Sequence, residues 1–400
     1  MKNINVVEPV FVSAFRCTGS ECRDHCCKGW DVDLDKASVN RYLKSSRIEI
    51  KTLATDNIIT TKNSYAKWGK IKLSGGTSCA FLDEKRLCKI HKDLGAAALS
   101  PTCATYPRIN LQFKQEEQKS VTISCPEAAR LLLTQPDAML LQQSTQIRKH
   151  EIKALDYPLE NKLLNLMCAN IANVCEVHMD EAFYAMANLF LYKEKLAGAP
   201  DSASKAEDYF FQLIGDLEQG NIAAQLSQIA PDYSLQWALL MRLQVYLSAK
   251  AGMRSWETLN HYVAKLIHIL TEGAKNNNTE LSMQRLDTVW NAKVMPWLSE
   301  RPHLMSNYIQ YRIYHDRFPS ENSTNLLPQL YLLVAEWFLL KSVIAACVEL
   351  VGEVVEEDII NIIYSYHAVT KHDAKSTVAF VEQIEKTKVN DDLSLIYLLR

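Results

Sequence analysis

The chain is 400 residues long, 48% hydrophobic and nearly balanced in charge, with 44 lysines and arginines against 46 aspartates and glutamates. Its 12 glycines and 12 prolines are too few for a collagen-like, linker-dominated or low-complexity protein. These values predict a soluble globular protein with enough apolar material for one to three domains.

The first third of the chain is predicted to be irregular, with short elements between its cysteines. Asp35 can cap a helix of about two turns, because its carboxylate accepts hydrogen bonds from the first turn. Residues 47–78 are polar and end on a serine-glycine-glycine-threonine turn signal, so a loop is expected there. A short strand is expected at 121–125, followed by a helix at 126–133 whose first residue is proline.

From about residue 137 onward the pattern changes to amphipathic helices, in which apolar residues recur at intervals of three and four. We find no fixed repeat length, which argues against a solenoid. The fold predicted is therefore mainly α, with an irregular cysteine-rich region (1–135) packed on an irregular all-helical domain (136–400). The helices expected are 159–177, 179–196, 204–219, 235–251, 256–274, 279–298, 302–318, 327–351, 357–374 and 377–385.

Two features bear on the compartment. The first residues contain no continuous apolar segment and no small-residue cleavage site, so we expect no secretory leader and a cytoplasmic location. The most apolar stretch, residues 330–351, is interrupted by Glu336, Lys341 and Glu349, whose charges are costly at membrane depth. We predict a buried helix there and no transmembrane segment, and leave peripheral membrane association open.

The two parts of the chain differ in charge, since the first 130 residues are net positive and the rest are net negative. Opposite charges can help two regions dock, or the positive part can hold an anionic group. The basic residues are not interleaved with aromatic ones and form no arginine-rich run, so no nucleic-acid partner is predicted.

Cysteines are concentrated near the N-terminus, where residues 17–125 contain eight of the 11. Cytosolic thiols stay reduced, and clustered ones bind metal more often than they form disulfides. A metal centre of soft ligands needs three or four thiolates from different loops. The candidate metal ligands are Cys17, Cys22, Cys26, Cys27, Cys79, Cys88, Cys103 and Cys125, whereas Cys168, Cys175 and Cys347 are expected only to pack.

Spacing alone leaves zinc and an iron–sulfur cluster equally favoured. Cys22 and Cys26 could form one zinc knuckle, but no matching second knuckle follows. The adjacent Cys26 and Cys27 point in divergent directions, which a multinuclear cluster tolerates better than a single ion. A radical S-adenosylmethionine loop is not matched, because Gly29 stands where its third cysteine belongs. A glycine-rich turn of Rossmann type is also lacking.

Six sequence blocks carry a family resemblance. They are Phe15-Arg16-Cys17-Thr18-Gly19, Cys22 with Cys26-Cys27-Lys28-Gly29-Trp30-Asp31, Cys79-Ala80-Phe81-Leu82, Leu87-Cys88-Lys89-Ile90-His91, Ser100-Pro101-Thr102-Cys103-Ala104-Thr105-Tyr106-Pro107-Arg108 and Ser124-Cys125-Pro126-Glu127-Ala128-Ala129-Arg130-Leu131. Read together, these blocks closely resemble the flagellin lysine-N-methylase family of bacteria. The cysteine-rich region is also similar to small cysteine-cluster domains that chelate zinc or iron. The motifs cover about the first 135 residues.

This resemblance implies a cytoplasmic enzyme that transfers a methyl group from S-adenosylmethionine to lysine ε-amino groups of flagellin. It also implies a [4Fe-4S] cluster held by the cysteine-rich region, and it therefore favours iron over zinc. The alternative is a zinc-stabilised, non-enzymatic adaptor whose helical part binds a protein partner.

Methyl transfer to lysine requires a neutral amine, so the enzyme must lower the lysine pKa from about 10.4 by desolvation or with a base. Neither a general base nor an S-adenosylmethionine pocket is assigned from the sequence. Several residues beside the cysteines are candidate bases, although each could instead have an ordinary packing or capping role. They are Asp24, His25, Asp31, Asp33, His91 and Tyr106. A four-thiolate cluster is anionic, so nearby cations would tune it, and those expected are Arg16, Arg23, Lys28 and Arg108.

Overall fold

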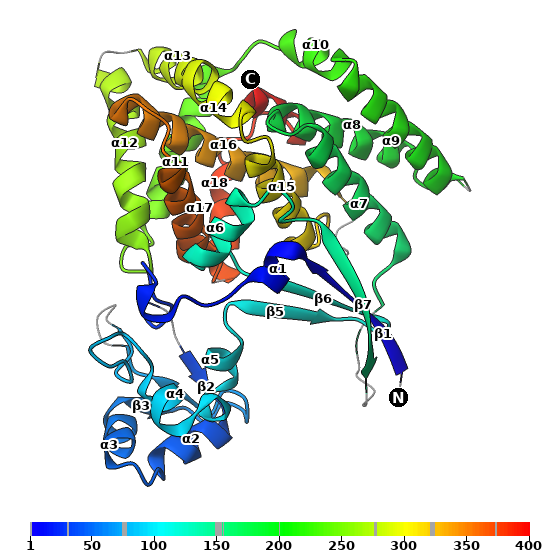
Figure 1. Ribbon diagram of the computed structural model, residues 1–400. Coiled ribbons are helices and arrows are strands. Elements are labelled where there is room, and N and C mark those ends of the chain that lie inside the picture. The colour runs from blue at the N-terminus through cyan, green and yellow to red at the C-terminus, as the bar shows by residue number, and fades with distance from the viewer. Residues whose placement is uncertain are drawn as a thin grey trace.

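A computed structural model of the chain shows a mainly helical protein with two small sheets. The residues it describes are 2–29, 32–73, 78–148, 154, 156–199, 201–275, 278–320, 325–372 and 374–400. In Figure 1 a small unit, coloured blue and cyan, lies beside a larger helical body, and the strands of the larger sheet run between them.

The larger sheet joins the start of the chain to a segment more than a hundred residues further on. Its order is β5 (Arg108–Gln112), β6 (Glu116–Val121), β1 (Lys2–Pro9) and β7 (Leu141–Arg148). Strand β1 is parallel to β6 and antiparallel to β7, and β5 is antiparallel to β6. Two helices, α1 (Val10–Ala14) and α6 (Pro126–Thr134), connect this sheet to the body.

The prediction of a strand at 121–125 is wrong, because β6 ends at Val121. Beyond it the Cys125 amide donates to the Thr122 carbonyl at 3.2 Å, and the Thr122 and Ser124 hydroxyls lie 3.1 Å apart. These bonds form a turn that leads into α6, whose proline start is as predicted.

The small unit has its own sheet and its own apolar core. The sheet order is β2 (Val32–Leu34), β4 (Gly69–Ile71) and β3 (Ile58–Thr60). Leu34, Tyr42 and Phe81 are among its fully buried residues. Its helices are α2 (Lys36–Leu43), α3 (Ile48–Asn57), α4 (Lys89–Leu94) and α5 (Pro101–Thr105), with short 3-10 turns at η1 (Gly19–Glu21) and η3 (Ala96–Ala98).

The predicted cap of α2 is confirmed, since the Asp35 carboxylate accepts from the Ser38 amide at 3.1 Å. The loop expected at 47–78 is wrong for much of its length, because α3, β3 and β4 lie within it. Ile50 and Ala54, one helical turn apart, are both completely buried and hold α3 on the core. Residues 74–77, where the turn signal falls, lie outside the described residues.

The helical body confirms the ten predicted helices, with ends that differ mostly by one to four residues. The helices are α7 (Leu159–Val174), α8 (Met179–Lys195), α9 (Ser202–Glu218), α10 (Asn221–Ser227), α11 (Tyr233–Ser248), α12 (Trp256–Lys275), α13 (Thr279–Val289), α14 (Met295–Ser299), α15 (His303–Asp316), α16 (Leu327–Val351), α17 (Glu356–Thr370) and α18 (Ala374–Glu385). The short helix α10 was not expected. One predicted helix, 279–298, contains a π-helical stretch, η4 (Trp290–Val294), between α13 and α14, and the chain ends in a 3-10 helix, η5 (Asp392–Leu399).

Helix α16 is the core helix of the body. It is long and apolar enough to cross a membrane, but 89% of its most apolar window is buried inside the protein, as predicted. Each of its three charges has a partner within the body. Glu336 is paired with Arg312, Lys341 with Asp180 at 2.6 Å, and Glu349 with Arg285 at 2.5 Å.

Packing forms two apolar cores. One core lies within residues 32–98, and the other combines residues 7–15 and 121–139 with the helical body. The division at residue 135 stays a prediction. The helices of the first part that flank the sheet nevertheless share a core with the second part.

The cysteine-bearing loop of residues 16–29 reaches the helical body at Gly29. Gly29 has φ +70°, and a Cβ there would lie 2.5 Å from the Arg254 backbone nitrogen. Glycine is therefore required both for the left-handed backbone and for the close approach of two loops.

Replacing Gly29 with alanine is expected to destabilise the protein by more than the left-handed strain alone. Gly198 is the matched control, since it has φ +84° and a methyl group added there would meet nothing within 4 Å. Gly198→Ala should cost about 1–2 kcal/mol, and Gly29→Ala clearly more, in urea unfolding of the full chain. Equal losses in the two variants would contradict the close loop contact.

Candidate active site and cysteine cluster

Five thiols of the cysteine-rich region interact with one another: Cys26, Cys27, Cys79, Cys88 and Cys103. They come from separate segments. Cys26 and Cys27 belong to the loop before β2, the Cys79 amide donates to the Cys27 carbonyl at 2.7 Å, Cys88 precedes α4, and Cys103 lies in α5. We call these side chains the five-thiol group.

The surroundings of the five-thiol group oppose the ionisation of four of its members, Cys27, Cys79, Cys88 and Cys103. A hydrogen bond from Cys27 lowers the pKa of the Cys26 thiol to about 7, and the same bond and burial raise that of Cys27. Burial raises the pKa of Cys79 to about 12, with further contributions from the negative charges of Cys88 and Cys103. Several thiolates at this place would therefore need a compensating cation.

The other N-terminal cysteines are placed differently. Cys17 is exposed, and Cys22 and Cys125 interact with each other at the start of α6. None of the eight N-terminal cysteines forms a disulfide. Within the described residues, no three His, Cys, Asp or Glu side chains are arranged to hold a metal ion, so the donor atoms suit a soft metal but their present spacing does not.

A buried ion pair connects the cysteine-bearing loop to the turn between α11 and α12. Asp24 and Arg254 are 5% and 3% exposed, and Arg254 Nε lies 3.2 Å from the Asp24 carboxylate. The Arg254 guanidinium also donates to the Asp24 carbonyl at 2.9 Å and to the Tyr106 hydroxyl at 2.6 Å. Ser255 donates to Asp24 as well. One arginine thereby joins three segments.

The candidate bases near the cysteines have structural partners. Asp24 is bound to Arg254 and lies 3.0 Å from Lys28, and Asp33 lies 3.4 Å from Lys67. His25 contacts the Ser78 hydroxyl at 3.3 Å, and His91 is exposed on α4. Asp31 lies outside the described residues.

The predicted cations are dispersed. Arg16 donates to the carbonyls of Ser13 and Phe15 at 2.8 Å, and Arg23 pairs with Glu357 on α17. Arg108 lies over the Phe15 ring at 5.0 Å. A tuning role of these residues toward a cluster stays a prediction. Sequence reasoning missed Arg254, whose charge partly offsets the burial that raises the pKa of Cys22 and Cys125.

A cavity of about 730 Å³ opens between the small unit and the helical body. Its wall comes from α5 and β5 on one side and from α15, α16, α17 and α18 on the other. Thr102 and Thr105, which flank Cys103 on α5, line it. The five-thiol group and the cavity therefore share one short helix.

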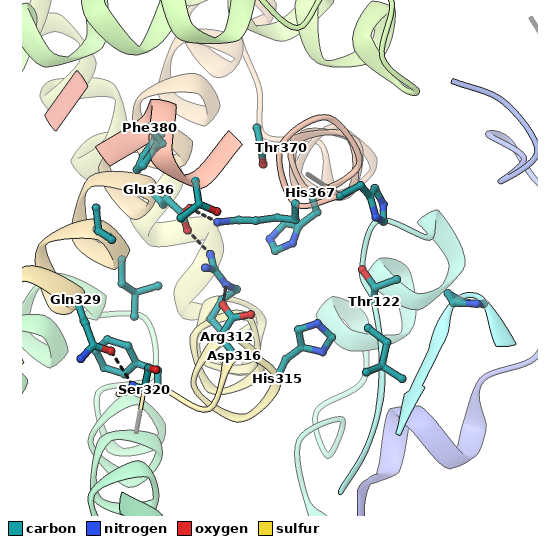
Figure 2. A pocket seen from close by; sticks show the side chains of 18 of the residues that line it. Thr122, Arg312, His315, Asp316, Ser320, Gln329, Glu336, His367, Thr370 and Phe380 are labelled. Atoms are coloured by element: carbon teal, nitrogen blue, oxygen red, sulfur yellow. Dashed lines mark hydrogen bonds and ion pairs between the residues drawn. The ribbon is translucent and has the colours of Figure 1, made fainter. Parts of the chain in front are cut away.

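The cavity wall contains a buried network of charges (Figure 2). The Arg312 guanidinium donates to Asp316 at 2.7 Å and to Glu336, and the Lys371 ammonium donates to the other oxygen of Glu336. Burial by itself would raise the pKa of Glu336, but Arg312 and Lys371 outweigh it and lower that pKa. Two cations and two anions thus balance in this wall, where the Arg312 and Glu336 side chains are each 7% exposed and that of Asp316 is 42% exposed.

Three histidines line the same cavity: His315, His367 and His372. Burial lowers the pKa of all three, to about 4 for His372, with further lowering from Arg312 at His315 and His367 and from Arg254 at His372. The imidazoles are therefore neutral at neutral pH and able to accept a proton. A cavity of this size with a few convergent polar groups is typical of a small-molecule site.

The sequence held one signal for this site. Glu336 interrupts the most apolar stretch of the chain, and a charge in such a stretch requires a buried partner. Neither that partner nor the contributions of residues 102–122 could be read from the sequence, because they are distant along the chain.

The structure is that of a mainly helical protein with a charge-lined cavity beside a thiol-rich unit. Residues 136–398 match the family model described as the FliB lysine N-methylase C-terminal domain. The chain is 37% identical over its whole length to the complete lysine-N-methylase of Salmonella typhimurium, and 36% identical, again over both full lengths, to that of Salmonella choleraesuis. The chain belongs to the lysine N-methylase family and is a protein-lysine N-methyltransferase.

Shorter relatives match the chain in part. The flagellar biosynthetic protein FliU of Salmonella muenchen is 47% identical over 38% of this chain and 90% of its own length. No solved structure matches the chain.

Replacing Arg254 with methionine is expected to lower the free energy of unfolding by about 3–5 kcal/mol, because Asp24 would stay buried with much of its compensation removed. Arg301→Met is the matched control, since the Arg301 side chain is 33% exposed and its ion-pair distances are 3.4 and 3.7 Å, so its loss should cost at most about 1 kcal/mol. Similar losses in chemical denaturation would show that Arg254 is not a buried link.

Proposed function

We propose that this enzyme methylates lysine side chains of flagellin in the cytoplasm, with S-adenosylmethionine as the methyl donor, and that the reaction takes place in the cavity between the small unit and the helical body. The single observation that carries this proposal is the cavity itself, with its paired charges and three neutral imidazoles. The flagellar name of a partial relative supports a flagellar substrate.

The chemistry suits such a cavity. The lone pair of a neutral lysine nitrogen forms a bond to the methyl carbon while the carbon–sulfur bond breaks and its electron pair returns to sulfur. The products are a methylated ammonium and S-adenosylhomocysteine. A site with little solvent favours this step, because positive charge on sulfur is lost and the amine must be free of its proton.

We propose further that the cysteine-rich unit binds a [4Fe-4S] cluster through four of the five grouped thiols. The support is the donor set, since five thiols from four segments lie close to one another, and the ionisation of several of them calls for a cation. The loop side chains would have to adjust, because their present spacing does not match a metal site. The cluster would supply a rigid anchor or redox chemistry next to α5.

A pair of variants on α18 tests the location of the reaction. Thr377 lines the cavity, whereas its neighbour Val378 is 61% exposed and lies outside the lining. With flagellin and S-adenosylmethionine, wild type should add methyl groups to lysines, as read by mass spectrometry. Thr377→Trp should reduce the rate at least about tenfold by filling the cavity, and Val378→Trp should retain it. If wild type loaded with metal does not methylate flagellin, flagellin is not its substrate. If the two variants react at equal rates, the reaction takes place outside this cavity.

The thiol assignment is tested by iron content. After anaerobic purification, wild type should contain iron and acid-labile sulfide, Cys103→Ser should lose most of both, and Cys17→Ser should keep them because Cys17 is exposed and outside the five-thiol group. A colourless wild type with stoichiometric zinc would remove the cluster and favour the zinc-stabilised alternative. If Cys17→Ser loses its iron and Cys103→Ser keeps it, the five-thiol group is not the cluster site.

A further inference from the structure

One histidine of the cavity is held so that a single ring nitrogen can act. His315, on the last turn of α15, has its Nδ1 at 2.7 Å from the Ser120 hydroxyl of β6. Its ring stacks on Tyr311 with centroids 4.8 Å apart. These two contacts fix the ring plane and leave Nε2 as the nitrogen available to the cavity. Figure 2 shows the ring projecting from α15 on the Thr122 side of the cavity.

The other two histidines are less suited to exchange a proton with a bound molecule. His367 is only 3% exposed, and its Nε2 lies 3.2 Å from the Tyr308 hydroxyl. His372 lies beyond the end of α17, where burial and then the Arg254 charge lower its pKa to about 4, so it is the weaker proton acceptor. His315 is half-buried and lines the cavity, so it combines access with a fixed orientation.

The cavity is also unfavourable to an additional ammonium group. Its carboxylates, Asp316 and Glu336, are already bound to Arg312 and Lys371. Arg108 adds a further positive charge to the lining. Lys371 shows how this wall acts on an ammonium group. Burial lowers the pKa of Lys371, and Arg312 lowers it further, although Glu336 raises it. An entering lysine would meet the same burial without a carboxylate of its own.

We propose that the cavity takes the target lysine as a free amine and that Nε2 of His315 accepts the proton that the ammonium gives up, with Ser120 as the positioning residue. This inference rests on the proposed function. The N–H bond of the ammonium breaks, its electron pair stays on nitrogen, and the proton forms a bond to Nε2. His315 passes this proton on to water, and the freed pair then attacks the methyl group of S-adenosylmethionine.

The charges around His315 are consistent with this role. Burial lowers its pKa, Asp316 opposes that effect and Arg312 adds to it, so the ring is neutral before the amine arrives. The charged and titratable groups of the cavity and of the surrounding elements are Tyr311, Arg312 and Asp316 on α15, Arg108 on β5, Tyr246 on α11, Glu336 on α16, His367 on α17, and Lys371, His372 and Tyr106 beside these elements.

Kinetics of His315→Gln against pH test the proton transfer. With flagellin, kcat at neutral pH should fall about 10²–10⁴-fold, with KM for S-adenosylmethionine unchanged, and the loss should shrink toward pH 10 as lysine loses its proton in solution. The kcat of Ser120→Ala should fall less than that of His315→Gln and should show the same dependence on pH. His268→Gln, an exposed change on α12, should leave the profile unchanged. A His315→Gln enzyme with the wild-type kcat and profile would overturn the assignment.

Binding of n-butylamine tests the free-amine part without methyl transfer. At pH 8 the amine is almost wholly protonated in solution, since its pKa resembles the value of about 10.4 for lysine. Calorimetry of the full chain in buffers of different ionisation enthalpy should therefore show roughly one proton released per amine bound, and Thr377→Trp should abolish binding. Binding without proton release, or no binding to wild type, would overturn the inference. If the protein binds the amine with proton release but does not methylate flagellin, flagellin is not its substrate, and the inference about the cavity still holds.

Discussion

The buried guanidinium of Arg312 is the interaction on which the helical body and its cavity depend. From α15 it reaches Glu336 on α16, and Glu336 in turn receives Lys371 from the end of α17. Each charge is acceptable in the interior only because the others are present. The same network that holds three helices together sets the electrostatic potential of the cavity wall, so the stability of the body and the chemistry of the site have one origin.

A second buried arginine has the corresponding role between the two parts of the molecule. Arg254 binds Asp24 of the cysteine-bearing loop and the hydroxyl of Tyr106, which lies just beyond α5. Helix α5 contributes Cys103 to the five-thiol group and two threonines to the cavity, so one short helix joins the two places. The arrangement makes the small unit a support for the site and not a separate appendage.

Prediction from sequence succeeded where structure is set locally. The helices of the body follow from apolar residues at intervals of three and four, and the cap at Asp35 follows from one carboxylate beside one helical turn. It failed at α3, where a polar segment is helical because Ile50 and Ala54 happen to meet the core of the small unit. Prediction from sequence also missed β7. Its partner β1 lies at the start of the chain, so nothing in the residues near β7 signals the pairing.

The sequence by itself determined the chemical inventory: a thiol-rich first part, a helical second part, a charge at position 336 within an apolar helix, and blocks that identify the family. Only the tertiary structure decided which five thiols come together, which arginine joins the two parts, and that His315 and Ser120, 195 residues apart, share a hydrogen bond. The physical reason is that helix formation depends on near neighbours in the chain. A cavity depends instead on the packing of whole elements, and no local pattern records it.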